Sequence, residues 1–145
     1  CYPCASQETY MNTKKFLVTA VVVFIVGFLL NFAIHAVLLH DDYSKLPNLL
    51  RTEQDAQNYF PYMIVANILY SLALAWIYAQ GVTEKPWIGQ GIRFGVAVWL
   101  MTAVPGYLTY YAVQPWPVEV IYKSIGFDLV RITLIGIVAA AIYRK

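Results

Sequence analysis

Long apolar runs, separated by short polar stretches, dominate this chain. Three runs have no charge in their interior, and a fourth, largely apolar, contains Lys123, Asp128 and Arg131 in its interior. Each run reaches the roughly 20 residues that a helix needs to cross a bilayer, whereas transmembrane β-strands would be about ten residues long and would alternate in hydrophobicity. The runs also lack the polar face of a water-exposed helix. The pattern therefore predicts four transmembrane helices, at about residues 16–39, 59–79, 92–113 and 118–143.

Composition agrees with this interpretation. Of the 145 residues, 60% are hydrophobic and 12% are charged, whereas soluble chains carry roughly 25% charged residues. We therefore expect an all-α integral membrane protein, a compact bundle with short loops and little mass outside the bilayer. The net charge of +2 is too small to indicate a nucleic-acid partner, so the expected partners are the lipid bilayer and other membrane-protein subunits.

Basic residues are distributed unequally between the two ends of the predicted helices. Cytoplasmic loops of membrane proteins carry an excess of Lys and Arg. One side has Lys14, Lys15, Lys85, Arg93, Arg144 and Lys145, and the other has Lys45, Arg51 and Lys123. This distribution predicts that both termini lie in the cytoplasm, and we expect a multi-pass protein of the bacterial inner (cytoplasmic) membrane.

The first ten residues differ in character from the rest of the chain. Met11 opens a short basic flank that leads directly into an apolar run, as at a native start, so residues 1–10 are interpreted as an extension or processing remnant and 11–145 as the transmembrane domain. The alternative is that Cys1 is the lipidated first residue of a lipoprotein. Cys1 and Cys4 form a C-x-x-C pair, but no His stands directly after it for haem attachment and no second pair completes a zinc site.

Two loops have their own patterns. In residues 41–58, Tyr43, Leu46, Leu49 and Leu50 recur at helical spacing among charges, which predicts a short surface helix that starts or is interrupted at Pro47. It could be a simple connector, a lid over a cavity or a docking surface. Residues 80–90 are rich in Gly and Pro and are interpreted, together with Gly91, as a turn.

Polar side chains occur at a similar depth in all four predicted helices, in the half of the membrane away from the termini. Such groups are costly in hydrocarbon and need a partner or a purpose. Asn31 and His35 are four residues apart and share a helix face, and Asp128 and Arg131 are three apart on the last helix. If these faces point inward, one cluster forms from Asn31, His35, Asn67, Tyr107, Tyr110, Asp128 and Arg131.

The cluster admits several interpretations. In a structural role, Asp128 and Arg131 neutralise each other while the other polar groups hold the helix register. In a functional role, the cluster forms a pocket for a polar head on an apolar body, and a quinone or a lipid is the candidate ligand. His35 and Asp128 would then be proton partners. Transport of a small ion or molecule is the third interpretation.

Catalytic motifs are missing from the sequence. The two histidines, His35 and His40, both lie at the end of the first predicted helix. A bis-histidine haem between helices needs one histidine on each of two helices. No metalloprotease, serine-hydrolase or phosphate-loop motif occurs. We therefore expect a protein that is not an enzyme, with no catalytic residue and no metal site.

Several segments resemble a group of small, uncharacterised bacterial inner-membrane proteins with four helices. They are the segment NFAIHAVLLHDDY (31–43) with Leu46-Pro47 after it, Gly91-Ile-Arg-Phe-Gly95, Pro105, and the Ile-Tyr-Arg-Lys end. The resemblance covers most of residues 11–145. It implies a four-helix fold and no activity.

Two functions remain open from the sequence. The first is a non-catalytic structural or accessory subunit that packs against a larger membrane complex, such as an energy-converting, electron-transfer or photosynthetic one. The chain has 12 Tyr, 7 Phe and 4 Trp, which suit lateral contacts with lipid, pigment or protein. The second is a free-standing binder or carrier of a quinone or lipid through the polar cluster.

Overall fold

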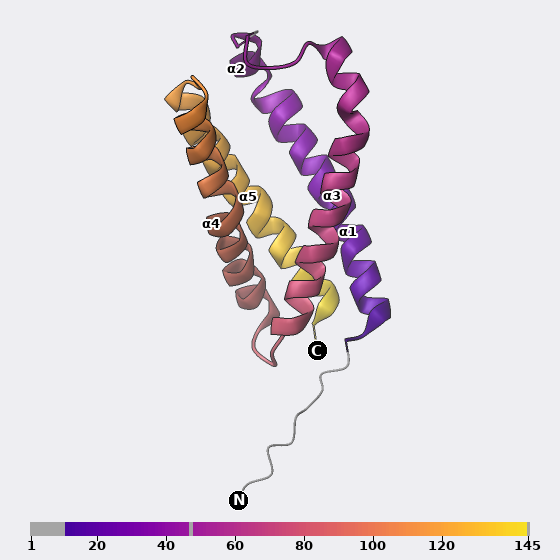
Figure 1. Cartoon of the computed structure of the whole chain (residues 1–145). Helices are drawn as coiled ribbons and strands as arrows, with labels where there is room; N and C mark the ends of the chain where they lie inside the picture. Colours follow the sequence, from indigo (N-terminus) through magenta and orange to yellow (C-terminus); the bar gives the residue numbers. More distant parts are fainter. Residues whose placement is uncertain (1–10, 47, 145) are drawn as a thin grey trace, which may run out of the picture.

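Four long helices make up most of the molecule (Figure 1). The computed structural model describes residues 11–46 and 48–144. Its elements are α1 (Thr13–Phe32), a π-helix η1 (Ala33–Leu38) that continues α1, α2 (His40–Ser44), α3 (Glu53–Gly81), α4 (Trp87–Val113) and α5 (Val118–Tyr143). No strand occurs among these described residues. The predicted extension at residues 1–10, with Cys1 and Cys4, lies outside them.

The four long helices have the length and composition of membrane spans. The segments are Thr13–Leu38, Glu53–Gly81, Trp87–Val113 and Val118–Tyr143. On α1, the side chains of Leu17, Val21, Ile25, Leu29 and Phe32 recur along one face and are 50–61% exposed. Apolar surface of this extent is typical of contact with lipid rather than with water. The prediction of an all-helical protein with four helices of this kind is therefore confirmed.

The helices pack in the order α3, α1, α5, α4. α1 contacts both α3 and α5, and α4 packs along α5, whereas α3 and α4 have little contact with each other. They meet near the α3–α4 loop, where the rings of Tyr78 and Phe94 pack edge to face with centroids 5.1 Å apart. Toward the other end they diverge (Figure 1). The four helices therefore do not pack as a closed ring, a detail on which the expectation of a compact bundle made no statement.

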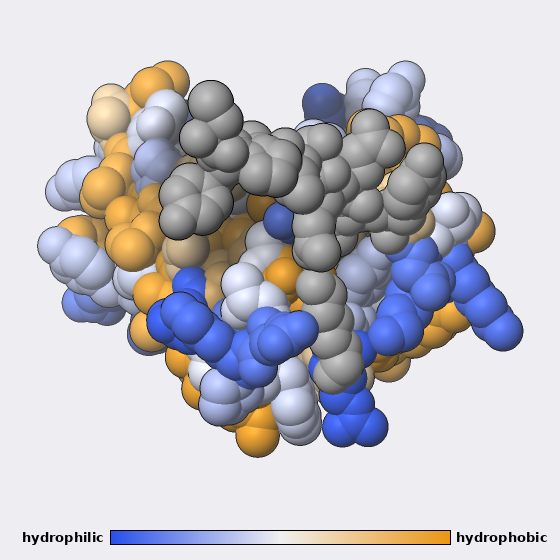
Figure 2. Space-filling model, turned by 90° about the horizontal axis from the view of Figure 1, so that it is seen from below, coloured by the Kyte–Doolittle hydropathy of each residue, from blue (hydrophilic) through white to orange (hydrophobic). Residues whose placement is uncertain are grey.

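The beginning of α1 and the end of α5 lie at the same end of the molecule. The Lys15 ammonium donates a hydrogen bond to the carbonyl oxygen of Arg144 at 2.9 Å. The α3–α4 loop, with Lys85, is at this end too (Figure 1). Figure 2 shows the same end, where hydrophilic side chains gather and hydrophobic ones lie toward the margin. We call it the basic end, and the opposite end, which carries α2, the α2 end.

Glycines allow α4 and α5 to approach closely. A Cβ atom on Gly95 would lie 2.6 Å from the Cα of Thr133, and one on Gly91 would lie 2.7 Å from the Cα of Ile137. Small residues permit such backbone contacts between membrane helices. Gly91 therefore lies inside α4 and not in a turn, because α4 begins at Trp87, five residues earlier than predicted.

Polar residues extend α3 beyond its apolar part. The helix begins at Glu53, six residues before the predicted boundary, and the Thr52 hydroxyl accepts a hydrogen bond from the backbone N–H of Asp55 at 3.3 Å. The Arg51 guanidinium also pairs with the Asp55 carboxylate at 2.8 Å. A capping residue and acidic residues in the first turn stabilise the start of a helix in water. A hydropathy pattern does not detect such polar turns, so the sequence prediction began α3 too late.

The region between α1 and α3 differs in detail from its prediction. The surface helix α2 spans only His40–Ser44, and Pro47 lies outside the described residues. The predicted helix through residue 39 changes to π geometry at Ala33–Leu38, where the backbone N–H of Leu39 donates to the carbonyl of Ile34 at 2.9 Å. Single π turns inside helices are frequent at functional sites.

Candidate functional site

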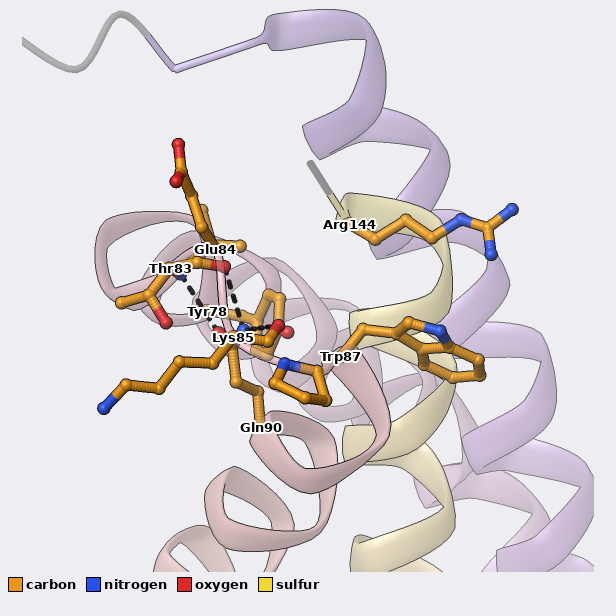
Figure 3. A pocket seen from close by; sticks show the side chains of 9 residues that line it. Tyr78, Thr83, Glu84, Lys85, Trp87, Gln90 and Arg144 are labelled. Atoms are coloured by element: carbon orange, nitrogen blue, oxygen red, sulfur yellow. Dashed lines mark hydrogen bonds between the residues drawn. The ribbon is translucent and has the colours of Figure 1, made fainter.

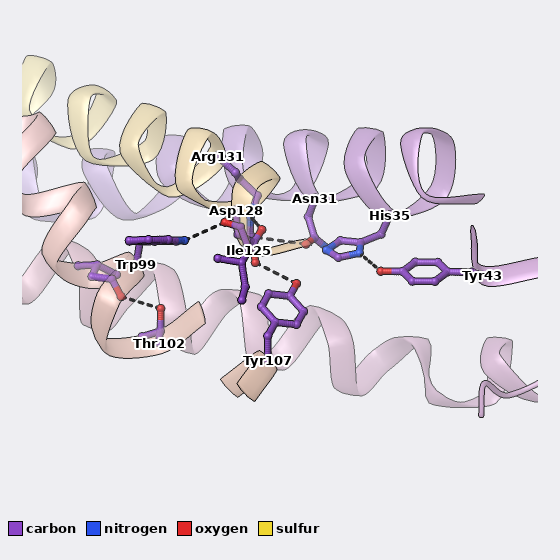
Figure 4. Close-up of polar contacts among 10 residues, drawn as sticks. Asn31, His35, Tyr43, Trp99, Thr102, Tyr107, Ile125, Asp128 and Arg131 are labelled. Carbon is purple, nitrogen blue, oxygen red and sulfur yellow. Dashed lines mark hydrogen bonds and ion pairs between the residues drawn. The ribbon is translucent and has the colours of Figure 1, made fainter. Parts of the chain in front are cut away.

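A buried ion pair forms the centre of the site (Figure 4). The Arg131 guanidinium donates from Nε to Oδ1 of Asp128 at 2.7 Å. Its Nη1 donates to Oδ1 of Asn31 on α1 at 3.1 Å, and the Tyr107 hydroxyl on α4 donates to Oδ2 of Asp128 at 3.0 Å. We call these four residues the polar cluster. It links three helices and contains four of the seven residues that the sequence analysis singled out.

The charges of the polar cluster are well shielded and well paired. The side chain of Asp128 is 5% exposed and that of Arg131 is 15% exposed. Both oxygens of the carboxylate accept a hydrogen bond from a neighbouring side chain, and hydrogen bonds to ionised groups are the strong ones. The cluster is therefore close to neutral overall, with its hydrogen-bonding groups fixed in direction.

His35 belongs to a second, adjacent group. Its Nδ1 lies 2.7 Å from the hydroxyl of Tyr43 on α2, and the two rings are almost parallel. The ring of Tyr43 in turn packs edge to face on Trp116. Burial raises the pKa of the Tyr43 phenol above its usual value, so the hydroxyl keeps its proton and can donate it to the imidazole. The π-helix thus places His35 against α2 and not against Asp128.

Asn67 and Tyr110 stand apart from the polar cluster. The Asn67 amide nitrogen donates to the carbonyl of Met63 on its own helix at 2.8 Å, so this donor is paired within α3. Tyr110 is 53% exposed, and its ring packs edge to face on Tyr107. Asn67 therefore makes no hydrogen bond to the cluster, while Tyr110 lies at its margin.

Two cavities adjoin these groups and share Tyr107 and Tyr110 in their linings. The first cavity, of about 280 Å³, lies among α3, α4 and α5, and Asp128 and Arg131 form part of its wall. The second cavity, of about 370 Å³, lies at the α2 end, where His35, Tyr43 and residues of the two loops at this end line it. The remaining lining residues of the first cavity are Tyr70, Thr102, Ala103, Gly106 and Ile132.

The sequence analysis missed Tyr70, and it placed Tyr43 in a surface helix without predicting its contact with His35. The Tyr70 hydroxyl is buried and has no hydrogen-bond partner among the described residues, although Tyr70 lines the first cavity. A signal for Tyr70 was present, since a tyrosine in the middle of an apolar span needs a partner for its hydroxyl. The contact of Tyr43 with His35 could not be found in the same way, because it depends on the fold of α2.

Metal ligands do not gather in this site. Among the described residues, no three His, Cys, Asp or Glu side chains lie close enough together to hold a metal ion. What the two cavities offer is a set of hydroxyl groups, one neutralised ion pair and apolar walls, which is a lining suited to an organic molecule.

The fold and this site define an all-helical protein with four helices long and apolar enough to span a membrane, and with a buried polar cluster beside two cavities. Residues 18–140 match the family described as "Protein of unknown function (DUF1761)", and the chain belongs to this family. The expectation of an uncharacterised family is confirmed. Comparison with curated proteins and with solved structures found no match.

Proposed function

We propose that this protein binds a lipid-soluble molecule with an oxygen-bearing head, a quinone or a lipid, in the first cavity. One observation carries the proposal. The Tyr70 hydroxyl is buried without a partner among the described residues, in the wall of a cavity where Tyr107, Asp128 and Arg131 are already paired with one another. An unpaired buried hydroxyl costs free energy that a ligand acceptor would recover.

The chemistry of the cavity indicates the kind of head group. Because Asp128 and Arg131 neutralise each other, the site has no surplus charge to attract an ion. A carbonyl or ester oxygen can accept a hydrogen bond from Tyr70, and Ala103 and Ile132 provide apolar wall. The cavity lies between α3 and α4, which have little contact with each other, so an apolar tail would extend toward the bilayer between these two helices.

The proposal includes an orientation in the membrane. The basic end would face the cytoplasm of a bacterial cell and the α2 end the opposite side of the inner membrane, with both termini cytoplasmic. The proximity of Lys15 to the end of α5 supports this assignment, because it places most of the basic residues at one end, as is usual for cytoplasmic surfaces.

The test uses protein extracted gently from its own membrane. Native mass spectrometry and an absorption spectrum would identify a bound quinone or lipid on the free-standing protein. Tyr70→Phe is expected to lower ligand retention about tenfold, since it removes one hydrogen bond of roughly 1–1.5 kcal/mol. Tyr62→Phe is the matched control, because Tyr62 lies on the same helix and is 72% exposed. Equal retention in both variants would overturn the proposal.

The second candidate function, an accessory subunit of a larger membrane complex, rests on a different observation. All buried residues of α3 lie between Ser71 and Ala79, and none lies in the half of the helix nearer the α2 end. That half offers apolar surface for another membrane protein. Co-migration with a larger assembly, with no small molecule bound, would favour this function over ligand binding.

A further inference from the structure

A separate cavity of about 480 Å³ lies at the basic end, far along the helices from the polar cluster. It is formed by the α3–α4 loop, the first turn of α4 and the end of α5. Figure 3 shows that Trp87 and Arg144 lie on one side of it and Thr83, Glu84 and Lys85 on the other. A smaller cavity of about 340 Å³, which includes Arg93 in its lining, adjoins it through shared residues.

The loop that frames this cavity is held in a defined shape. The Gln90 side chain accepts a hydrogen bond from the backbone N–H of Thr83 at 3.0 Å. Its amide nitrogen donates to the carbonyls of Thr83 and Lys85 at 2.9 and 2.7 Å. The donors and acceptors of Gln90 are thus used within the loop (Figure 3), and the groups that remain for a ligand are those of the other lining residues.

The electrostatics of the cavity favour an anion. Lys85 and Arg144 exceed the single carboxylate of Glu84 by one positive charge. The N-terminus of α4 is also here, since Pro86 and Trp87 line the cavity. No side chain in the described part of the chain caps this helix, and no acidic residue occupies its first turn. Free N–H groups and the helix dipole at such a terminus favour negative charge.

An independent observation comes from Tyr78. Its side chain lines both cavities and is 4% exposed overall, yet its hydroxyl has no hydrogen-bond partner among the described residues. The ring is held by Phe94 and Tyr143. A buried phenol that donates to nothing in the described part of the chain is a ready donor for a ligand oxygen, and oxyanions are the strongest acceptors.

We propose that the cavity at the basic end binds a phosphate group, supplied either by an anionic membrane lipid or by free phosphate. Lys85, Arg144 and the N-terminus of α4 would balance its charge, and Tyr78 would donate a hydrogen bond to one of its oxygens. Trp87 would lie beside the lipid at the depth of the head groups, which tryptophan side chains favour. This site is independent of the ligand proposed for the first cavity.

The experiment distinguishes the two sources of phosphate. The full chain is placed in nanodiscs of phosphatidylcholine with or without phosphatidylglycerol, and retained lipid is counted by native mass spectrometry. Inorganic phosphate is titrated separately and followed by ³¹P line broadening. Selective retention of phosphatidylglycerol identifies a lipid site, and saturable broadening identifies a site for free phosphate. The absence of both effects would overturn the proposal.

Single substitutions then localise the binding. Lys85→Gln is expected to weaken binding about fivefold, as removal of one basic residue near a membrane surface does. Tyr78→Phe is expected to weaken binding about tenfold, because a hydrogen bond to a charged group is lost. Glu84→Gln is expected to strengthen it several-fold, because a repulsive carboxylate is lost. Lys45→Gln, at the α2 end, is the matched control.

The pattern of these effects decides the outcome. Circular dichroism shows whether each variant is folded. The site would be overturned if folded Lys85→Gln and Tyr78→Phe bound phosphate or phosphatidylglycerol as well as Lys45→Gln does. Because Tyr78→Phe keeps the ring that packs on Phe94, a loss of binding with unchanged secondary structure would support it.

Discussion

Asp128 and Arg131 show why a charged residue in a membrane helix is tolerated. Each alone would be costly in hydrocarbon, but here the guanidinium binds the carboxylate of the preceding turn, and Asn31 and Tyr107 complete the hydrogen bonds. Their spacing of three residues allowed the ion pair to be predicted from the sequence, since such residues are neighbours on a helix. The contacts to Asn31 and Tyr107 depended on how the helices pack.

Removing one partner of the Asp128–Arg131 ion pair should lower the free energy of unfolding more than removing both. Asp128→Ala leaves Arg131 poorly exposed and without its counter-charge, and we expect a loss of about 3–5 kcal/mol in the free energy of unfolding. Combining it with Arg131→Met should restore part of this loss, because the uncompensated charge is gone. Denaturation in mixed micelles measures both variants. A double variant no more stable than Asp128→Ala alone would contradict the explanation.

Asp42 and Lys123 connect α2 to α5 at the surface. Their carboxylate and ammonium lie 2.8 Å apart, and the hydrogen bond from Lys123 lowers the pKa of the Asp42 carboxyl below its usual value. A carboxyl with a lower pKa in the folded state stabilises the fold above its unfolded pKa of about 3.9 and ceases to do so as the pH falls through the folded value. The contact is therefore expected to fail in acid.

This pH dependence can be measured on α2 itself. We expect hydrogen-exchange protection at residues 40–44 to fall as the pH drops below about 4, after correction for the intrinsic exchange rate. Lys123→Gln should lower this protection already at neutral pH and flatten the acid response. Arg51→Gln, which alters only the separate pair with Asp55, should leave the response intact. Equal acid responses in wild-type protein and in Lys123→Gln would show that the contact does not hold α2.

At the scale of the elements, the extent of each helix was predictable only where it is apolar. The last helix was predicted with the observed bounds, residues 118–143, because its apolar run starts directly after a proline. α3 and α4 begin earlier than their apolar runs do. The start of α3 is capped by Thr52, and α4 begins at Trp87, directly after Pro86. The π-helix Ala33–Leu38 had no signal in the sequence, because its apolar residues suit either helix geometry.

Close packing of α4 on α5 gives a test at this scale. A Cβ atom on Gly136 would lie 2.9 Å from the Cα of Gly95, so Gly136→Ala must push the helices apart. We expect it to cost about 1–3 kcal/mol of unfolding free energy, as overpacking does. Gly126→Ala on the same helix meets no atom within 4 Å and should be neutral or slightly stabilising. Equal effects in a micelle denaturation experiment would argue against the close contact.

At the scale of the whole molecule, the notable feature is that α3 and α4 have little contact with each other. The first cavity lies between them and α5. The sequence indicated which residues are polar and at what depth they lie, and this was enough to anticipate the association of Asn31, Tyr107, Asp128 and Arg131. It did not indicate that the Asn67 amide nitrogen is paired within its own helix, since an asparagine can bond to the preceding turn or across helices.

The proposed orientation can be tested on the intact chain in bacteria. Green fluorescent protein attached after residue 145 is expected to fluoresce, and alkaline phosphatase at the same position is expected to be inactive, because both report a cytoplasmic location. Alkaline phosphatase inserted in residues 48–52, at the α2 end, is expected to be active. The reverse pattern would invert the orientation and place the proposed phosphate site on the other side of the membrane.

The sequence by itself determined the all-helical class, the four long apolar helices and the positions of the polar residues along them. These properties depend on hydropathy and helical spacing, which are local features of the chain. The tertiary structure decided which polar groups meet, that α3 and α4 diverge, and that Tyr70 and Tyr78 keep hydroxyl groups without partners among the described residues. Such features depend on the relative positions of helices distant in the chain, and an apolar exterior constrains those positions very little, because lipid satisfies any apolar face equally well.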